Sequence, residues 1–118
     1  MRSGGEPPGQ LQRFKAEFFK ALAHPLRIRI LEHLQTRERS VQELQELLDA
    51  EQPIVSQQLA VLRVKHIVQA RKEGTTVRYA VRDPLVRELL AVARQIFNNQ
   101  LIDTQTMLRA LRRERRRP

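Results

Sequence analysis

Pro53-Ile54-Val55-Ser56-Gln57-Gln58-Leu59-Ala60-Val61-Leu62-Arg63 is the stretch that decides the fold class. Val55, Leu59 and Leu62 recur at helical spacing and predict a short helix with one buried apolar stripe. The other face carries hydroxyl, amide and guanidinium groups and no acid, as a helix in the DNA major groove requires. Taken alone, the pattern would also fit an ordinary amphipathic surface helix.

A second short helix is predicted directly before this one. Ser40-Val41-Gln42-Glu43 has the form of a capping box, in which Ser40 caps the helix and Glu43 reaches back to the cap. Asp49 to Gln52 leaves only a brief turn before Pro53, and two short helices joined in this way form a helix-turn-helix. The residues expected on the buried face of the capped helix are Val41, Leu44, Leu47 and Leu48.

After Lys65-His66 the hydrophobic pattern changes from a helical period to an alternating one. Segments 67–72 and 76–81 predict two strands joined by a tight turn at Glu73-Gly74-Thr75. A hairpin that follows such a helix is a wing, so its basic residues should lie close to phosphates or a minor groove. His66 ends the helix where a left-handed backbone is expected, a conformation that histidine tolerates.

Further helices are expected on both sides of this region. Residues 10–23 carry apolar side chains at helical spacing, and Pro25 suits the first turn of a helix that continues to about Gln35. Asp83-Pro84 is a start signal for a long final helix, in which Asn98-Asn99 marks a place for a bend or a break.

The first and last helices carry more apolar surface than one small domain can cover. Such surface indicates association with a second copy, so we expect a homodimer formed through these two helices. The residues expected in the intersubunit core are Leu11, Phe14, Phe18, Leu89, Val92 and Ile96.

Length and composition set the remaining limits. A chain of 118 residues predicts one domain, at 10–111, with a disordered N-terminal tail at 1–9 and a basic C-terminal tail at 112–118. A net charge of +9, from 22 basic and 13 acidic residues, favours a nucleic-acid partner. The absence of cysteine excludes disulfides and thiolate metal sites and fits a cytoplasmic protein. No apolar run approaches the ~20 residues that span a bilayer, so no membrane partner is expected.

The order of these elements resembles the ArsR/SmtB family of bacterial transcription regulators. The likeness is carried by Ala21-Leu22-Ala23-His24-Pro25-Leu26-Arg27-Ile28-Arg29-Ile30-Leu31, by residues 56–63 and by the wing from Arg71 to Tyr79, and it covers roughly residues 11–97. The resemblance implies a winged helix-turn-helix, mainly α with a small β-hairpin in the order α-α-α-α-β-β-α. It also implies a homodimer that binds double-stranded DNA and, in many members of the family, is released from it by metal ions.

The metal ligands of the family do not carry over to this chain. Ser40 and Gln42 stand where one type of member has its cysteine ligands, and neither is a good soft ligand. We therefore expect no metal and no cofactor. Nickel or zinc binding would have to use His24, His33 or His66 with carboxylates across the dimer. A second type of member binds its metal through Asp and His residues on the last helix. Of these positions Asp83 keeps its acid, but the others are occupied by Pro84, Leu85, Ile96 and Asn99.

No catalytic constellation is present, because Ser56 has no general base nearby and Glu43 is explained by capping. The sequence predicts a homodimeric DNA-binding regulator, more specifically a repressor, acting on an inverted-repeat operator. Two alternatives stay open: a non-specific architectural nucleic-acid binder, and a protein-interaction module that docks through the long last helix. The residues expected to bind DNA are Gln57 and Gln58 at the bases and Ser56, Arg63, Arg71, Lys72 and Arg78 mainly at phosphates.

Overall fold

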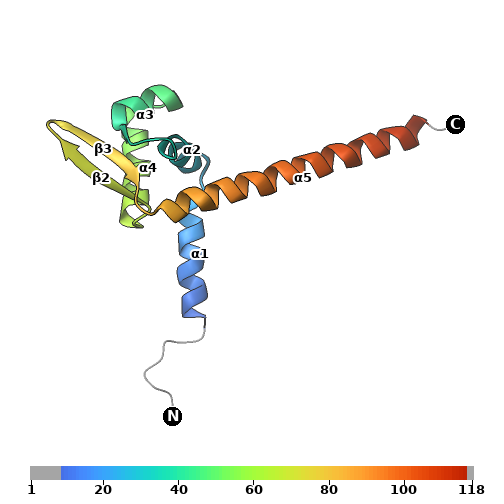
Figure 1. The fold of residues 1–118 in the computed structure, drawn as a ribbon, viewed down its shortest axis with the longest axis horizontal. Helices are drawn as coiled ribbons and strands as arrows, with labels where there is room; N and C mark the ends of the chain where they lie inside the picture. Colours follow the sequence, from blue (N-terminus) through green and yellow to red (C-terminus); the bar gives the residue numbers. More distant parts are fainter. Residues whose placement is uncertain (1–8, 117–118) are drawn as a thin grey trace, which may run out of the picture. The chain divides into compact units, whose positions relative to one another are not determined.

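The computed structural model describes residues 9–116, which form two units divided between Asp83 and Pro84. The first unit is a winged helix-turn-helix and the second is a single helix, so the expected fold class, mainly α with a small sheet, is confirmed (Figure 1). The elements of the first unit are α1 (Gln10–Leu22), α2 (Pro25–Leu34), β1 (Arg39–Ser40), α3 (Val41–Leu48), α4 (Gln52–Val64), β2 (Val68–Glu73) and β3 (Thr76–Val81).

The helix-turn-helix consists of α3 and α4. The predicted capping box is confirmed: the Ser40 hydroxyl accepts a hydrogen bond from the Glu43 backbone N–H at 3.2 Å, and the Ser40 backbone N–H donates to the Glu43 carboxylate at 3.2 Å. Asp49, with φ of 50°, ends α3 in the left-handed region, and α4 begins three residues later. The turn between the two helices is therefore as short as the sequence predicted.

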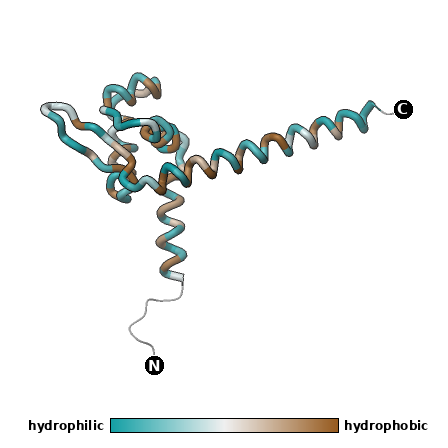
Figure 2. The backbone as a smooth tube through the Cα atoms, viewed as in Figure 1, coloured by the Kyte–Doolittle hydropathy of each residue, from teal (hydrophilic) through white to brown (hydrophobic). Residues whose placement is uncertain are grey.

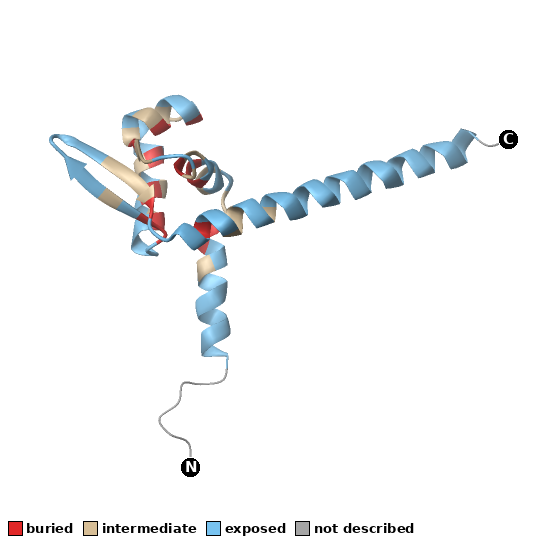
Figure 3. Ribbon diagram, in the orientation of Figure 1, coloured by how far each residue is buried: buried red, intermediate tan, exposed pale blue. Residues whose placement is uncertain are grey.

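The core of this unit is built around the apolar stripe of α4. Val55, Leu59 and Leu62 are all 0% exposed, as predicted, and the buried residues gather among α2, α3, α4 and the adjoining end of the hairpin (Figure 3). Leu44 and Leu48 of α3 are buried too. The prediction for Leu47 was wrong, because it is 40% exposed. At about 100° per residue, Leu47 lies at the edge of the face that Leu44 and Leu48 define.

The wing is an antiparallel hairpin of β2 and β3, as predicted, with Gly74 at φ of 63° in its two-residue turn. A third strand, β1, was not predicted. It pairs with β3 and gives the strand order β1-β3-β2, in which Ser40 lies opposite Arg78. This pairing connects the start of α3 to the wing.

Two histidines have structural roles at helix ends. His24 caps α2, since its Nδ1 accepts a hydrogen bond from the Leu26 backbone N–H at 3.1 Å. His66 follows α4 with φ of 59°, in the expected left-handed region. The third, His33, is half-buried in the last turn of α2.

The second unit is α5 (Pro84–Arg116), which starts at the predicted proline. It runs through Asn98-Asn99 without a break, so the expected division of the helix was wrong. Asparagine lowers helix propensity by less than ~1 kcal/mol, too little to end a long helix. Residues 112–116 of the expected basic tail continue this helix and are exposed.

The expected N-terminal tail lies outside the described residues, except for Gly9, which precedes α1. Residues 117 and 118 lie outside them as well. Within residues 9–116 no helix combines the length and the apolar character that crossing a membrane requires.

Candidate nucleic-acid interface

The solvent-facing side of α4 is the first part of the candidate interface. The helix contains no acidic residue from Gln52 to Val64, and its buried stripe holds it against the rest of the unit. Gln57 lies opposite the stripe and is exposed, with no side-chain hydrogen bond to any described residue. Ser56 is half-buried, and its hydroxyl accepts a hydrogen bond from the Gln52 amide at 2.9 Å. Gln57 therefore has both its amide donors and its acceptor available for a base edge.

Gln58 has an internal partner that the sequence did not predict. Its Oε1 accepts a hydrogen bond from Nη1 of Arg27 at 3.0 Å. Arg27, on α2, also donates from Nε to the Ala21 carbonyl at 2.6 Å and from Nη2 to the Lys20 carbonyl at 3.5 Å, both near the end of α1. Arg27 thus ties α4 to α1. Because a guanidinium has no acceptor, the Gln58 oxygen must face Arg27, which uses one of its two lone pairs and fixes its direction.

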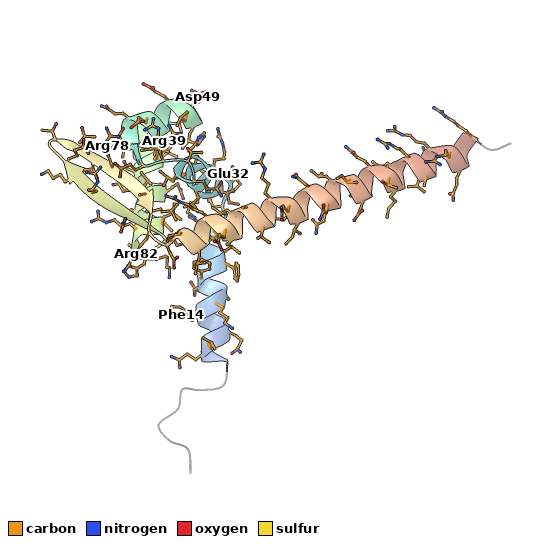
Figure 4. The ribbon with its side chains drawn as sticks, viewed as in Figure 1. Phe14, Glu32, Arg39, Asp49, Arg78 and Arg82 are labelled. Atoms are coloured by element: carbon orange, nitrogen blue, oxygen red, sulfur yellow. The ribbon has the colours of Figure 1, made fainter. Side chains whose placement is uncertain are left out.

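Two arginines of the wing are held by carboxylates. We call Glu38, Glu43, Glu73, Arg71 and Arg78 the wing ion cluster. Arg71 Nη2 pairs with Glu38 and, at 2.9 Å, with Glu73; Arg78 pairs with Glu43 at 3.0 Å and with Glu73 at 3.7 Å. Arg78 lies on β3, beside the start of α3 (Figure 4). Both arginines were predicted to bind DNA, and in this structure both are engaged within the protein.

The Glu43 carboxylate of the cluster is ionised at neutral pH. The pKa of Glu43 is lowered from 4.5 to about 2, first by the hydrogen bond from the Ser40 backbone and then by Arg37, which pairs with it at 2.8 Å. Hydrogen bonds to Glu38 and then to Glu73 raise the pKa of Arg71 above its ordinary value. Glu43 therefore serves both as a helix cap and as the partner of a wing cation, whereas the sequence indicated only the cap.

Other predicted cations have no such partner. Arg63 of α4 and Lys72 of β2 are exposed, and neither makes an ion pair with a described residue. The candidate interface therefore has two classes of cation: Arg63 and Lys72 are available to phosphates, while Arg71 and Arg78 are paired with carboxylates that compete with phosphates.

An apolar groove lies between α1 and the end of α4, within the first unit. It measures about 400 Å³, and its apolar lining includes Phe14, Phe18 and Val64. Phe14 projects from α1 and is 75% exposed (Figure 4). Brown, apolar stretches recur along α1 and also along α5 (Figure 2), where Val92 and Ile96 are 51% and 49% exposed. Each of the two helices thus carries apolar side chains that one copy of the chain leaves open to solvent.

Residues that could hold a metal do not gather in this structure. Among residues 9–116, no group of three or more His, Asp or Glu side chains is close enough to bind an ion. His24 already uses its Nδ1 to cap α2.

A capped α3, an acid-free α4 and a basic wing together make up a winged helix-turn-helix domain. The chain belongs to the arsR family of bacterial regulatory proteins, whose profile matches residues 24–70. It is 48% identical over 103 residues to the uncharacterised HTH-type transcriptional regulator Rv0081 of Mycobacterium tuberculosis, covering 86% of this chain and 90% of that protein.

The chain is also similar to a second curated protein and to two solved structures, one of which is Rv0081 itself. The biofilm growth-associated repressor of Agrobacterium fabrum is 39% identical over 82 residues, which is 70% of each chain. The crystal structure of Rv0081 matches with a TM-score of 0.76 and covers 85% of this chain and 98% of that one. The homodimeric winged helix-turn-helix DNA-binding domain of Mb0332 from Mycobacterium bovis matches with a TM-score of 0.75 at 28% identity, covering 84% and 94%.

Proposed function

We propose that this regulator is a repressor that binds an inverted-repeat operator as a homodimer and reads bases through α4. The observation that carries the proposal is the exposed, acid-free face of α4 around Gln57, held rigidly by a stripe of fully buried side chains. A relative of the same family is a repressor, and a structural neighbour is a homodimeric DNA-binding domain.

A second copy of the chain is the partner that we propose for the apolar residues of α1 and α5. The groove beside Phe14 and Phe18 would receive apolar side chains of that copy. The proposed intersubunit core comprises Leu11, Phe14, Phe18, Leu89, Val92 and Ile96. Two recognition helices related by a twofold axis would then enter successive major grooves, ~34 Å apart.

Within each half-site we assign base reading to Gln57 first. Adenine takes a bidentate amide, which needs a donor and an acceptor together, and Gln57 has both available. Gln58 is less free to orient its amide toward a base, because Arg27 holds its oxygen. Ser56, Arg63 and Lys72 would hold phosphates, and Arg71 and Arg78 would do so in competition with their carboxylates.

The test is a comparison of two duplexes: one selected by the wild-type protein from a random pool, and one random sequence of equal length. Gln57→Ala is expected to bind the selected duplex about 5- to 150-fold less tightly, corresponding to the ~1–3 kcal/mol of a bidentate base contact. Its binding to the random duplex should be unchanged. The exposed Gln105 of α5 provides the control, and Gln105→Ala should bind both duplexes as the wild type does.

Other results would favour other functions. Equal binding of selected and random duplexes by the wild type would indicate a non-specific architectural protein. Failure to bind any duplex at low salt would favour a protein-interaction module. If Gln57→Ala behaves as the wild type on both duplexes, Gln57 does not read bases.

We also propose that the protein acts without a bound metal or cofactor and without catalysis, in the bacterial cytoplasm where the chromosome is. Support comes from the residues at the family's ligand positions, such as Ser40, which serves as a helix cap. Titration calorimetry with nickel and zinc, followed by DNA binding with each metal, tests this. A metal that binds below micromolar concentration and changes DNA affinity more than tenfold, about 1.4 kcal/mol, would show the proposal to be wrong.

A further inference from the structure

The arrangement of the wing explains why acids gather there. Arg71 and Arg78 lie directly opposite each other on β2 and β3. Like charges in this position repel and destabilise a hairpin. Glu73 pairs with both arginines, at 2.9 Å and 3.7 Å, and thereby reduces the repulsion. The acids of the wing ion cluster therefore stabilise the free form of the wing.

The same pairing occupies part of the guanidinium groups that DNA would use. A guanidinium binds carboxylate and phosphate oxygens through the same N–H donors. Nη2 of Arg71 donates to Glu38 and also lies within ion-pair distance of Glu73. A phosphate can contact this nitrogen only when a carboxylate gives way. The acids thus compete with DNA for the wing.

Such competition is reversible because the pairs are exposed. The side chains of Arg71, Glu38 and Glu73 are 53%, 37% and 56% exposed. Exposed ion pairs contribute ~0–1 kcal/mol, which a phosphate contact can offset. Glu43 differs from these two acids, because it also caps α3 and its loss would disturb the helix-turn-helix itself.

We propose that Glu38 and Glu73 lower the DNA affinity of the wing by holding Arg71, and together with Glu43 also Arg78, in ion pairs that compete with phosphates. The proposal rests on the DNA-binding function proposed above. It makes the two glutamates determinants of affinity, although neither needs to contact DNA. After displacement their charges would still face the DNA backbone, so the acids weaken binding both before and after the exchange.

The experiment measures binding of the full chain to a random 30-base-pair duplex and to the selected duplex over a series of salt concentrations. Glu38→Gln and Glu73→Gln should each bind both duplexes about 2- to 10-fold more tightly, a gain comparable to the ~0–1 kcal/mol of an exposed pair together with the removed repulsion. The slope of log affinity against log salt should steepen, by up to ~0.9 for each further phosphate that the freed arginines neutralise.

Glu32→Gln is the matched control, because Glu32 is an exposed residue of α2 outside the wing ion cluster (Figure 4). It removes the same charge and should change neither the salt slope nor, beyond a small general effect, the affinity. Thermal unfolding of each variant measures how far the wing is destabilised, and the direction of the change in DNA affinity separates competition from bracing. If the acids only brace the wing, both variants will melt at lower temperature and bind DNA more weakly.

Two results separate this inference from the function on which it rests. Wild-type protein that binds the selected duplex, with Glu38→Gln and Glu73→Gln no tighter than Glu32→Gln, overturns the inference alone. Wild-type protein that binds no duplex at low salt overturns the proposed function and the inference together.

Discussion

Replacing Phe14 with aspartate is expected to weaken operator binding by about 100-fold or more, while leaving each copy folded. Phe14 is 75% exposed, so its removal takes almost nothing from the core of one copy. At the proposed dimer interface, however, an aspartate would place an unpaired charge among apolar side chains, which is strongly unfavourable. A monomer engages one half-site at a time and loses the ~10²- to 10⁴-fold gain that linking two sites gives.

Sedimentation velocity and operator titration on the same samples check this prediction. Wild-type protein should sediment as a dimer at micromolar concentration, and Phe14→Asp as a monomer with the wild-type far-UV circular dichroism per residue. Gln12→Asp is the control, since Gln12 is exposed on the same helix and the change of charge is identical. A wild-type monomer, or a dimeric Phe14→Asp that binds the operator normally, would contradict the proposed interface.

The elements that local sequence determines were predicted well. The stripe of Val55, Leu59 and Leu62 specifies both the helix and its buried side, because apolar periodicity reports which face packs. Ser40 and Glu43 lie three residues apart, so their capping box depends on no distant partner. The left-handed backbone at His66, just after α4, is also a local feature and was predicted.

What the sequence did not reveal depends on contacts between distant residues. β1 has only two residues, Arg39 and Ser40, and exists because β3 pairs with it. Gln58 accepts a hydrogen bond from Arg27 of another helix, whereas its neighbour Gln57 is exposed. No local feature of the sequence distinguishes these two glutamines. The wing ion cluster was missed for the same reason, because Glu38 lies 33 residues before Arg71 in the chain. A list of cations in a sequence cannot show which of them are already paired.

Leu59→Ala is expected to destabilise the protein by about 2–5 kcal/mol, the range for truncating a buried leucine. Leu59 is 0% exposed and lies between Val55 and Leu62 in the stripe that holds α4. Removing its isobutyl group deletes buried contacts and leaves a cavity that the rigid helix cannot fully close. Domains of this size are stable by only ~5–15 kcal/mol, so this one change would remove a large part of the total.

Urea unfolding at a fixed protein concentration measures the loss, since dimerisation would make apparent stability depend on concentration. Gln57→Ala is the control on the same helix: Gln57 is exposed and lies outside the groove, and its truncation should change the free energy of unfolding by less than about 0.5 kcal/mol. A loss below about 1 kcal/mol for Leu59→Ala would show that the stripe does not anchor α4. The argument for base reading by Gln57 would then fail as well, because a side chain can discriminate between bases only when the helix that carries it is held in place.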